Sequence, residues 1–77
     1  MALKYKMKRP EGVDALAGAG VSTASDLAML AGISRGSAQR VFRGDGIPVS
    51  VAIKVVHALQ NEDVETSVSV MFEEVSA

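Results

Sequence analysis

The sequence predicts a small, mainly helical (α+β) domain whose two ends form strands of one antiparallel sheet. Between residues 10 and 60, apolar residues recur at helical spacing, and helix-capping and helix-ending residues separate the segments. Residues 2–9 and 66–75 instead alternate between apolar and polar side chains, as strands do. A length of 77 residues is enough for one small domain, so we expect four helices and two strands in a single unit spanning residues 1–77.

The centre of the chain, residues 24–43, predicts two short helices joined by a tight turn. Thr23 can cap the first helix, and Asp26 can bond back to it, as in a capping box with Asp in place of Glu. Gly32 suits the left-handed conformation that ends a helix, and Ser34 is a good N-cap for the second helix. The apolar residues expected to face the core are Leu27, Ala28, Ala31, Ile33, Ala38 and Val41.

The opposite side of the second helix is polar and basic. It carries Arg35, Gly36, Ser37, Gln39, Arg40 and Arg43. Two short helices with such a front are what a reader of the DNA major groove requires. We expect Arg35 and Arg40 to pair with guanine and Gln39 with adenine, while Gly36 allows close approach. The residues expected to contact the DNA backbone are Thr23, Ser25, Ser34, Ser37 and Arg43. The alternative is that the arginines form only a solvated face.

This segment resembles the Cro/repressor family (Xre-type, lambda-repressor-like) of helix-turn-helix proteins from phages and bacteria. The matching residues are Leu27-Ala28, Ala31-Gly32-Ile33-Ser34, Val41 and Gly44, within a resemblance that extends from about Ala15 to Gln60. The resemblance implies a four-helix domain that acts as a dimeric repressor on a palindromic operator. A similar string occurs in the LacI-type headpiece, so the subfamily stays open.

Three positions depart from the family pattern. Ala24 stands where a phosphate-binding Gln is common, which removes one expected contact. Gly36 lies inside the second helix and weakens it by up to about 1 kcal/mol. Ala38 replaces a larger aliphatic residue, which suggests closer packing of the two helices.

Two further helices are expected to pack around this pair. The first begins at Pro10 and closes at Gly18 and Gly20. Its expected inner stripe consists of Val13, Leu16 and Ala17. The last helix runs from Pro48 to about Gln60, with Ala52, Ile53, Val56 and Leu59 as its apolar stripe and Val55 beside it. His57, the one histidine, is expected to be a surface or partly buried helix residue.

The terminal strands are expected to pair with each other. In residues 2–9, Leu3, Tyr5 and Met7 alternate with Lys4, Lys6 and Lys8, which also fits a basic arm lying along DNA. In residues 66–75, Val68, Val70 and Phe72 share one face, and pairing would bring Glu73 and Glu74 near the lysines. Because a two-stranded sheet is marginal alone, we expect two sheets to join edge to edge and to bury these three residues in a homodimer. The alternative is a frayed tail.

The charges are unevenly distributed. The formal net charge is −1, but residues 1–60 hold all eight basic residues and only four acids, a balance of +4. Residues 61–77 hold five acids and no base, a balance of −5. A basic body with an acidic tail fits a DNA-binding unit whose tail faces away from phosphates.

Other function classes find little support in the sequence. There is no cysteine, no metal-ligand spacing, no phosphate-binding loop and no paired nucleophile and base, so we expect no cofactor, no metal and no enzymatic activity. No apolar run approaches the roughly 20 residues of a membrane span, no signal peptide is evident, and no small-molecule site is indicated, so a cytoplasmic, nucleoid-associated protein is expected. Two alternatives stay open: an antitoxin or antirepressor that binds protein through its C-terminal strand, and an architectural or recombination accessory factor that bends DNA.

Overall fold

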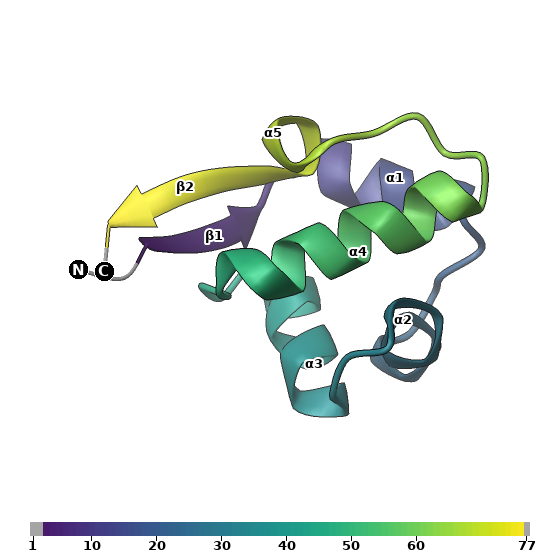
Figure 1. Ribbon diagram of the computed structural model, residues 1–77, viewed down its shortest axis with the longest axis horizontal. Helices are drawn as coiled ribbons and strands as arrows, with labels where there is room; N and C mark the ends of the chain where they lie inside the picture. The colour runs from purple at the N-terminus through teal and green to yellow at the C-terminus, as the bar shows by residue number, and fades with distance from the viewer. Residues whose placement is uncertain (1–2, 77) are drawn as a thin grey trace.

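The chain folds into a group of helices with a two-stranded sheet at one end (Figure 1). The computed structural model describes residues 3–76. In chain order, the elements are β1 (Leu3–Met7), α1 (Glu11–Gly18), α2 (Ala24–Ala31), α3 (Arg35–Arg43), α4 (Val49–Asn61), α5 (Val68–Met71) and β2 (Phe72–Ser76). The predicted mainly helical fold with a small antiparallel sheet from both ends is confirmed, with five helices in place of four. Ala2 of the predicted first strand, and Met1 and Ala77 of the predicted domain, lie outside the described residues.

The longest helix, α4, lies at the centre of the molecule (Figure 1). The pair α2 and α3 lies on one side of it, and α1 and α5 lie on the other. Its buried residues are Ala52, Val55, Val56, Ala58 and Leu59. Ile53, which was predicted to belong to the apolar stripe, is 41% exposed, and that assignment is wrong. Val55 belongs to the stripe instead, because residues 52, 55, 56 and 59 follow the helical period more closely.

Helix α1 packs through a different face from the one predicted. Leu16 is buried as expected, but Val13 is 42% exposed and Ala17 is also exposed, so the predicted stripe is wrong at these two positions. The buried partner of Leu16 is Gly12, one turn earlier. A Cβ atom at Gly12 would lie only 2.2 Å from Cγ of Met7 and 3.2 Å from the backbone oxygen of Met71. The missing side chain lets α1 approach β1 and α5 closely, and this turns residue 13 outward.

The sheet joins the two ends of the chain in antiparallel pairing. Its register is Leu3↔Ser76, Lys4↔Val75, Tyr5↔Glu74, Lys6↔Glu73 and Met7↔Phe72. The predicted pairing of the terminal strands is confirmed, with Lys6 directly opposite Glu73. On its other edge, β1 pairs with Ile47, because the backbone N–H groups of Tyr5 and Ile47 each donate to the other residue's carbonyl oxygen at 2.9 Å. Strand β1 is therefore the inner strand, and within residues 3–76 no strand pairs with the outer edge of β2.

The C-terminal segment differs most from its prediction. The strand predicted over residues 66–75 begins only at Phe72, because residues 68–71 form the single helical turn α5. Ser67 caps this turn, and its Oγ accepts a hydrogen bond from the backbone N–H of Val70 at 3.3 Å. The turn breaks the alternation of side chains: Phe72 is buried in the core, Val68 is half-buried against it, and Val70 is 48% exposed. The predicted common face of these three residues is therefore wrong.

Candidate nucleic-acid interface

The first helix of the central pair begins with the predicted capping box. The Thr23 hydroxyl oxygen accepts from the backbone N–H of Asp26 at 3.1 Å, and the Thr23 backbone N–H donates to the Asp26 carboxylate at 3.2 Å. Ser22 adds two more bonds to that carboxylate, from its backbone N–H at 3.3 Å and from its hydroxyl at 3.2 Å. The backbone bond from Ser22, with the bonds from the Thr23 and Ser22 side chains, lowers the pKa of Asp26. A negative charge of the protein itself therefore lies at the start of α2, next to the expected phosphate position.

The turn and the boundaries of α3 also agree with the sequence. Gly32 ends α2 with a left-handed φ of 66°, and Gly44 ends α3 with a φ of 77°. Ser34 caps α3 by accepting from the backbone N–H of Ser37 at 3.1 Å, and its hydroxyl donates to the Ser37 hydroxyl at 3.0 Å. Ile33 packs against the core between the helices. The two short helices and the tight turn predicted for residues 24–43 are confirmed in these details.

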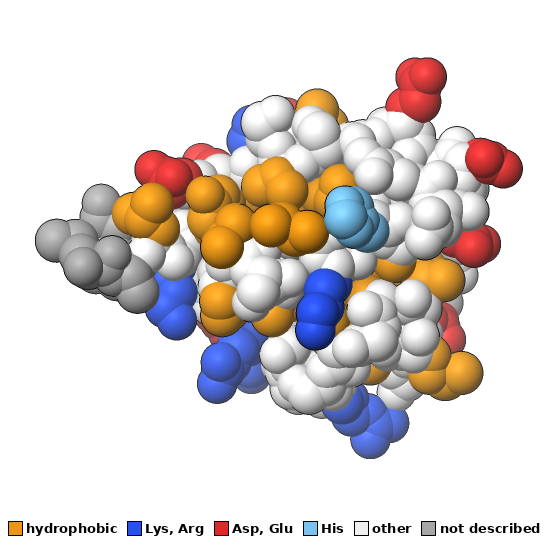
Figure 2. All heavy atoms as spheres, viewed as in Figure 1, with side chains coloured by type: hydrophobic (Ala, Val, Ile, Leu, Met, Phe, Trp, Pro, Cys, Tyr) orange, Lys and Arg blue, Asp and Glu red, His pale blue; other side chains and the backbone are white. Residues whose placement is uncertain are grey.

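The two sides of α3 differ sharply in exposure. Ala38 and Val41 are fully buried against the core. Arg35, Gly36, Gln39, Arg40 and Arg43 are all exposed. Blue side chains gather along the lower edge of the molecule, below β1 and around α3, whereas most red side chains lie along the upper and right edges (Figure 2). The exposed side of α3 is thus part of a basic face.

A contact between the two helices fixes one of the predicted base-reading residues. The Arg35 guanidinium donates from Nε at 3.1 Å and from Nη2 at 2.8 Å to the hydroxyl oxygen of Ser25. These two bonds use only part of the donor set of the guanidinium. Ser25, for which a phosphate contact is predicted, orients Arg35 in the structure. The sequence did not indicate this pairing, because the two residues lie on different helices, although both flank the predicted turn.

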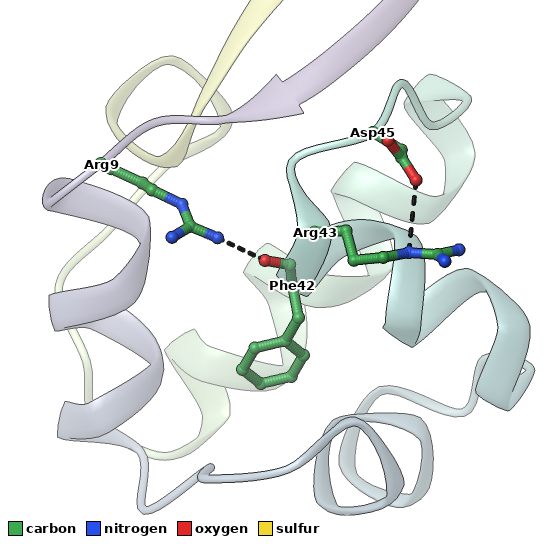
Figure 3. A network of polar contacts seen from close by, with 4 residues as sticks. All are labelled: Arg9, Phe42, Arg43 and Asp45. Carbon is green, nitrogen blue, oxygen red and sulfur yellow. Dashed lines mark hydrogen bonds and ion pairs between the residues drawn. The ribbon is translucent and has the colours of Figure 1, made fainter.

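The C-terminal end of α3 carries two arginine contacts (Figure 3). Nε of Arg43 lies 3.3 Å from Oδ2 of Asp45, and both side chains are exposed. Arg9 reaches across from the segment between β1 and α1, and its Nη2 donates to the carbonyl oxygen of Phe42. A cation at this end of a helix satisfies a terminal carbonyl group and complements the helix dipole. Arg9 was not among the predicted site residues, because this contact depends on the tertiary fold.

A shallow recess connects the start of α2 with the second half of α3. It is lined by Ser22, Thr23, Ala24, Gln39, Phe42 and Arg43. The structure therefore brings Thr23 close to Gln39 and Arg43, while Ser25, Ser34 and Ser37 gather around the start of α3. The residues predicted for dimerisation are not part of this surface: Val68 and Val70 lie on α5, and Phe72 lies in the core.

Residues 3–76 hold neither a cluster of metal-ligating side chains nor a helix fit to cross a membrane. They contain no group of three or more His, Asp or Glu side chains placed to hold a metal ion, and His57 is exposed on α4. None of their helices combines the length and the apolar character needed to cross a membrane. No protein-family model, curated protein or solved structure matches this chain. The resemblance to the Cro/repressor family therefore rests on the residues of the motif alone.

Proposed function

We propose that this protein is a sequence-specific, DNA-binding regulator of transcription that places α3 in the major groove. The observation that carries the proposal is the division of α3 into a fully buried side, with Ala38 and Val41, and an exposed side that presents Arg40 and Gln39. Arginine pairs in bidentate fashion with guanine, and glutamine does so with adenine. The helix is capped at both ends, so these side chains project from a fixed support.

The remaining residues of the exposed surface have supporting roles in this proposal. Arg35 reads a base while Ser25 holds its guanidinium in place. Gly36 allows close approach, since a Cβ at this position would meet only the Ser34 hydroxyl, at 4.0 Å. Arg43 contacts phosphate beyond the end of α3. Thr23 acts mainly by capping α2, because its hydroxyl and its backbone N–H are both engaged with Asp26.

The proposal includes a homodimer that binds a palindromic operator as a repressor in the cytoplasm. Its support is the open outer edge of β2 among the described residues, with Val70 exposed beside it. Two such edges can pair across a two-fold axis, which would set the spacing between the two α3 helices. Phe72 would stabilise each protomer, whereas Val70 would lie near the contact.

The open edge of β2 also favours a second candidate function. A sheet edge can add a strand from another protein, so an antitoxin or antirepressor type of module would use β2 to bind a protein partner. In that case, the polar side of α3 would be a solvated surface. An architectural DNA-binding factor is distinguished by bending DNA with weak sequence preference.

Selection from random duplex DNA tests the proposal. We expect enrichment of a roughly palindromic sequence. Arg40→Ala should weaken binding to that sequence by about 1–3 kcal/mol while changing binding to a scrambled duplex much less. Lys54→Ala, which removes an exposed charge from α4, is the matched control.

The other outcomes separate the alternatives. Binding without enrichment would indicate an architectural factor, and no binding to any duplex at low salt would leave the protein-binding module. Sedimentation addresses the dimer independently, because a monomer at tens of micromolar would contradict it.

A further inference from the structure

Strand β1 is attached to the segment that leaves the C-terminal end of α3. Tyr5 and Ile47 exchange two backbone hydrogen bonds of 2.9 Å. Lys4 lies against Gly46, since a Cβ built on that glycine would be 3.1 Å from Cβ of Lys4. Arg9 adds the hydrogen bond to the carbonyl oxygen of Phe42, in the last turn of α3. Strand β1 and the segment that follows it are therefore held near the C-terminal end of α3 by three separate contacts.

The two faces of the sheet have different environments. Residues directly opposite each other in an antiparallel pair share a face, so Met7 and Phe72 lie on one face, and both are buried. Because successive residues of a strand alternate between faces, Lys4 and Lys6 lie on the other one. Lys6 is exposed and Lys4 is half-buried. The other residues of this face are Glu73, opposite Lys6, and Val75, opposite Lys4.

Lys8 does not belong to this face, although the sequence alternation grouped it with Lys4 and Lys6. It follows the end of β1, and its Nζ donates to the backbone oxygen of Ser69 at 2.8 Å. Ser69 lies in α5, on the side of α4 away from the α2–α3 pair (Figure 1). The chain thus provides two lysines on one face of β1, of which Lys4 lies beside the segment that leaves α3, and one nearby lysine directed elsewhere.

We propose that Lys4 and Lys6 form a second phosphate-binding surface, which contacts the DNA backbone flanking the base pairs read by α3. A helix in the major groove has a phosphate backbone on either side, and the chain beyond its C-terminus meets one of them. Two residues advance a strand by roughly 6.6 Å, so the two ammonium groups can reach different phosphates. Some of the blue side chains in Figure 2 lie below β1 and others around α3, along the same lower edge of the molecule, whereas further blue atoms lie in the middle of this face and at its upper edge.

This inference rests on the proposed function, and a pair of double variants tests it. The double variant Lys4→Ala/Lys6→Ala is compared with Lys8→Ala/Lys54→Ala. The second variant also removes two positive charges, but from positions outside the proposed phosphate-binding surface. The probes are a duplex obtained by selection, the same duplex trimmed by roughly half a helical turn on each side, and a scrambled duplex. Dissociation constants are measured over a series of KCl concentrations.

We expect the Lys4/Lys6 variant to make the negative slope of log K against log salt shallower by about 2, since each phosphate contact contributes about −0.9 to it. It should weaken binding to the selected and scrambled duplexes by the same factor, because phosphate contacts carry no base information. The Lys4/Lys6 variant should also bind the full-length selected duplex and the trimmed duplex equally well, whereas the wild-type protein should bind the full-length duplex more tightly. The Lys8/Lys54 variant should retain the wild-type slope.

Equal slopes for the two double variants would overturn this inference and leave the proposed function intact. Failure of the wild-type protein to bind any duplex at low salt would overturn the proposed function and, with it, this inference. Because Lys4 packs against Gly46, the comparison is repeated with Lys4→Gln/Lys6→Gln, which keeps most of the side-chain length. Thermal melting by circular dichroism verifies that each variant is folded.

Discussion

The helix pair α2–α3 and the two terminal segments obtain their structure in different ways. In the helix pair, the caps act over short distances, from Thr23 to Asp26 and from Ser34 to Ser37, three positions in each case. In the terminal segments, the contacts join residues far apart, such as Tyr5 with Glu74, 69 positions away. Sequence patterns describe the first kind of structure well. They describe the second kind poorly, because its determinants lie elsewhere in the chain.

The largest expected effect concerns the terminal segments. Phe72→Ala should reduce the free energy of unfolding by about 3–5 kcal/mol, because the side chain is 2% exposed and lies in the core of the single chain. Chemical denaturation at two protein concentrations measures the loss. The loss should not depend on concentration if Phe72 stabilises the protomer.

Val70→Ala is the control for Phe72. Val70 is 48% exposed, so its truncation should change stability within about 0.5 kcal/mol. A small effect of Phe72→Ala, or one that shrinks as the protein is diluted, would instead place Phe72 at an interface between copies, as the alternation of residues 66–75 predicted.

The next largest effect concerns the helix pair α2–α3, where replacing each of two glycines by alanine should change the free energy of unfolding in opposite directions. Gly32→Ala should destabilise the protein by about 1–2 kcal/mol, because a φ of 66° is unfavourable for a residue with a Cβ atom. Gly36→Ala should stabilise it by up to about 1 kcal/mol, because Gly36 lies within α3, where space is open around it. Urea denaturation of both variants measures the sign of each change in the free energy of unfolding. A neutral or stabilising effect of Gly32→Ala would contradict the assignment of Gly32 as the left-handed end of α2, and a destabilising effect of Gly36→Ala would contradict the open space around Gly36.

The smallest expected effect comes from the bonds around Asp26. Because the folded-state pKa of Asp26 is lowered, its contribution to stability is present above the ordinary carboxyl pKa of about 3.9 and is lost as the pH falls further through the folded-state value. Asp26→Asn should therefore reduce the dependence of stability on pH below about pH 4. Ser22→Ala, which removes one donor to the carboxylate, should reduce it less. Denaturation curves between pH 2 and 6 provide the measurement, and an unchanged pH dependence in Asp26→Asn would show that these bonds do not affect stability.

The sequence thus predicted the fold class and the exposed face of α3, and it failed where packing depends on distant contacts. The faces of Val13 and Ile53 were mistaken because apolar side chains identify a helix face only approximately. In α1, the close approach at Gly12 selects a face next to the predicted one. The turn α5 was missed because its sequence, Val-Ser-Val-Met, continues an apolar/polar alternation that also fits a strand. Within the candidate site, the exposed position of Arg40 followed from local spacing, whereas the contact of Arg9 with Phe42 required the folded chain.

The pairing of Leu3 with Ser76 brings the two ends of the described chain side by side in the sheet. The chain leaves the sheet at Met7, passes through the helices and returns to the sheet at Phe72. A fluorophore attached near residue 3 or near residue 76 would consequently report on the same end of the molecule, the end away from α2 in Figure 1. We also expect a chain opened between α4 and α5, with its two ends joined, to keep the pairing of β1 with β2.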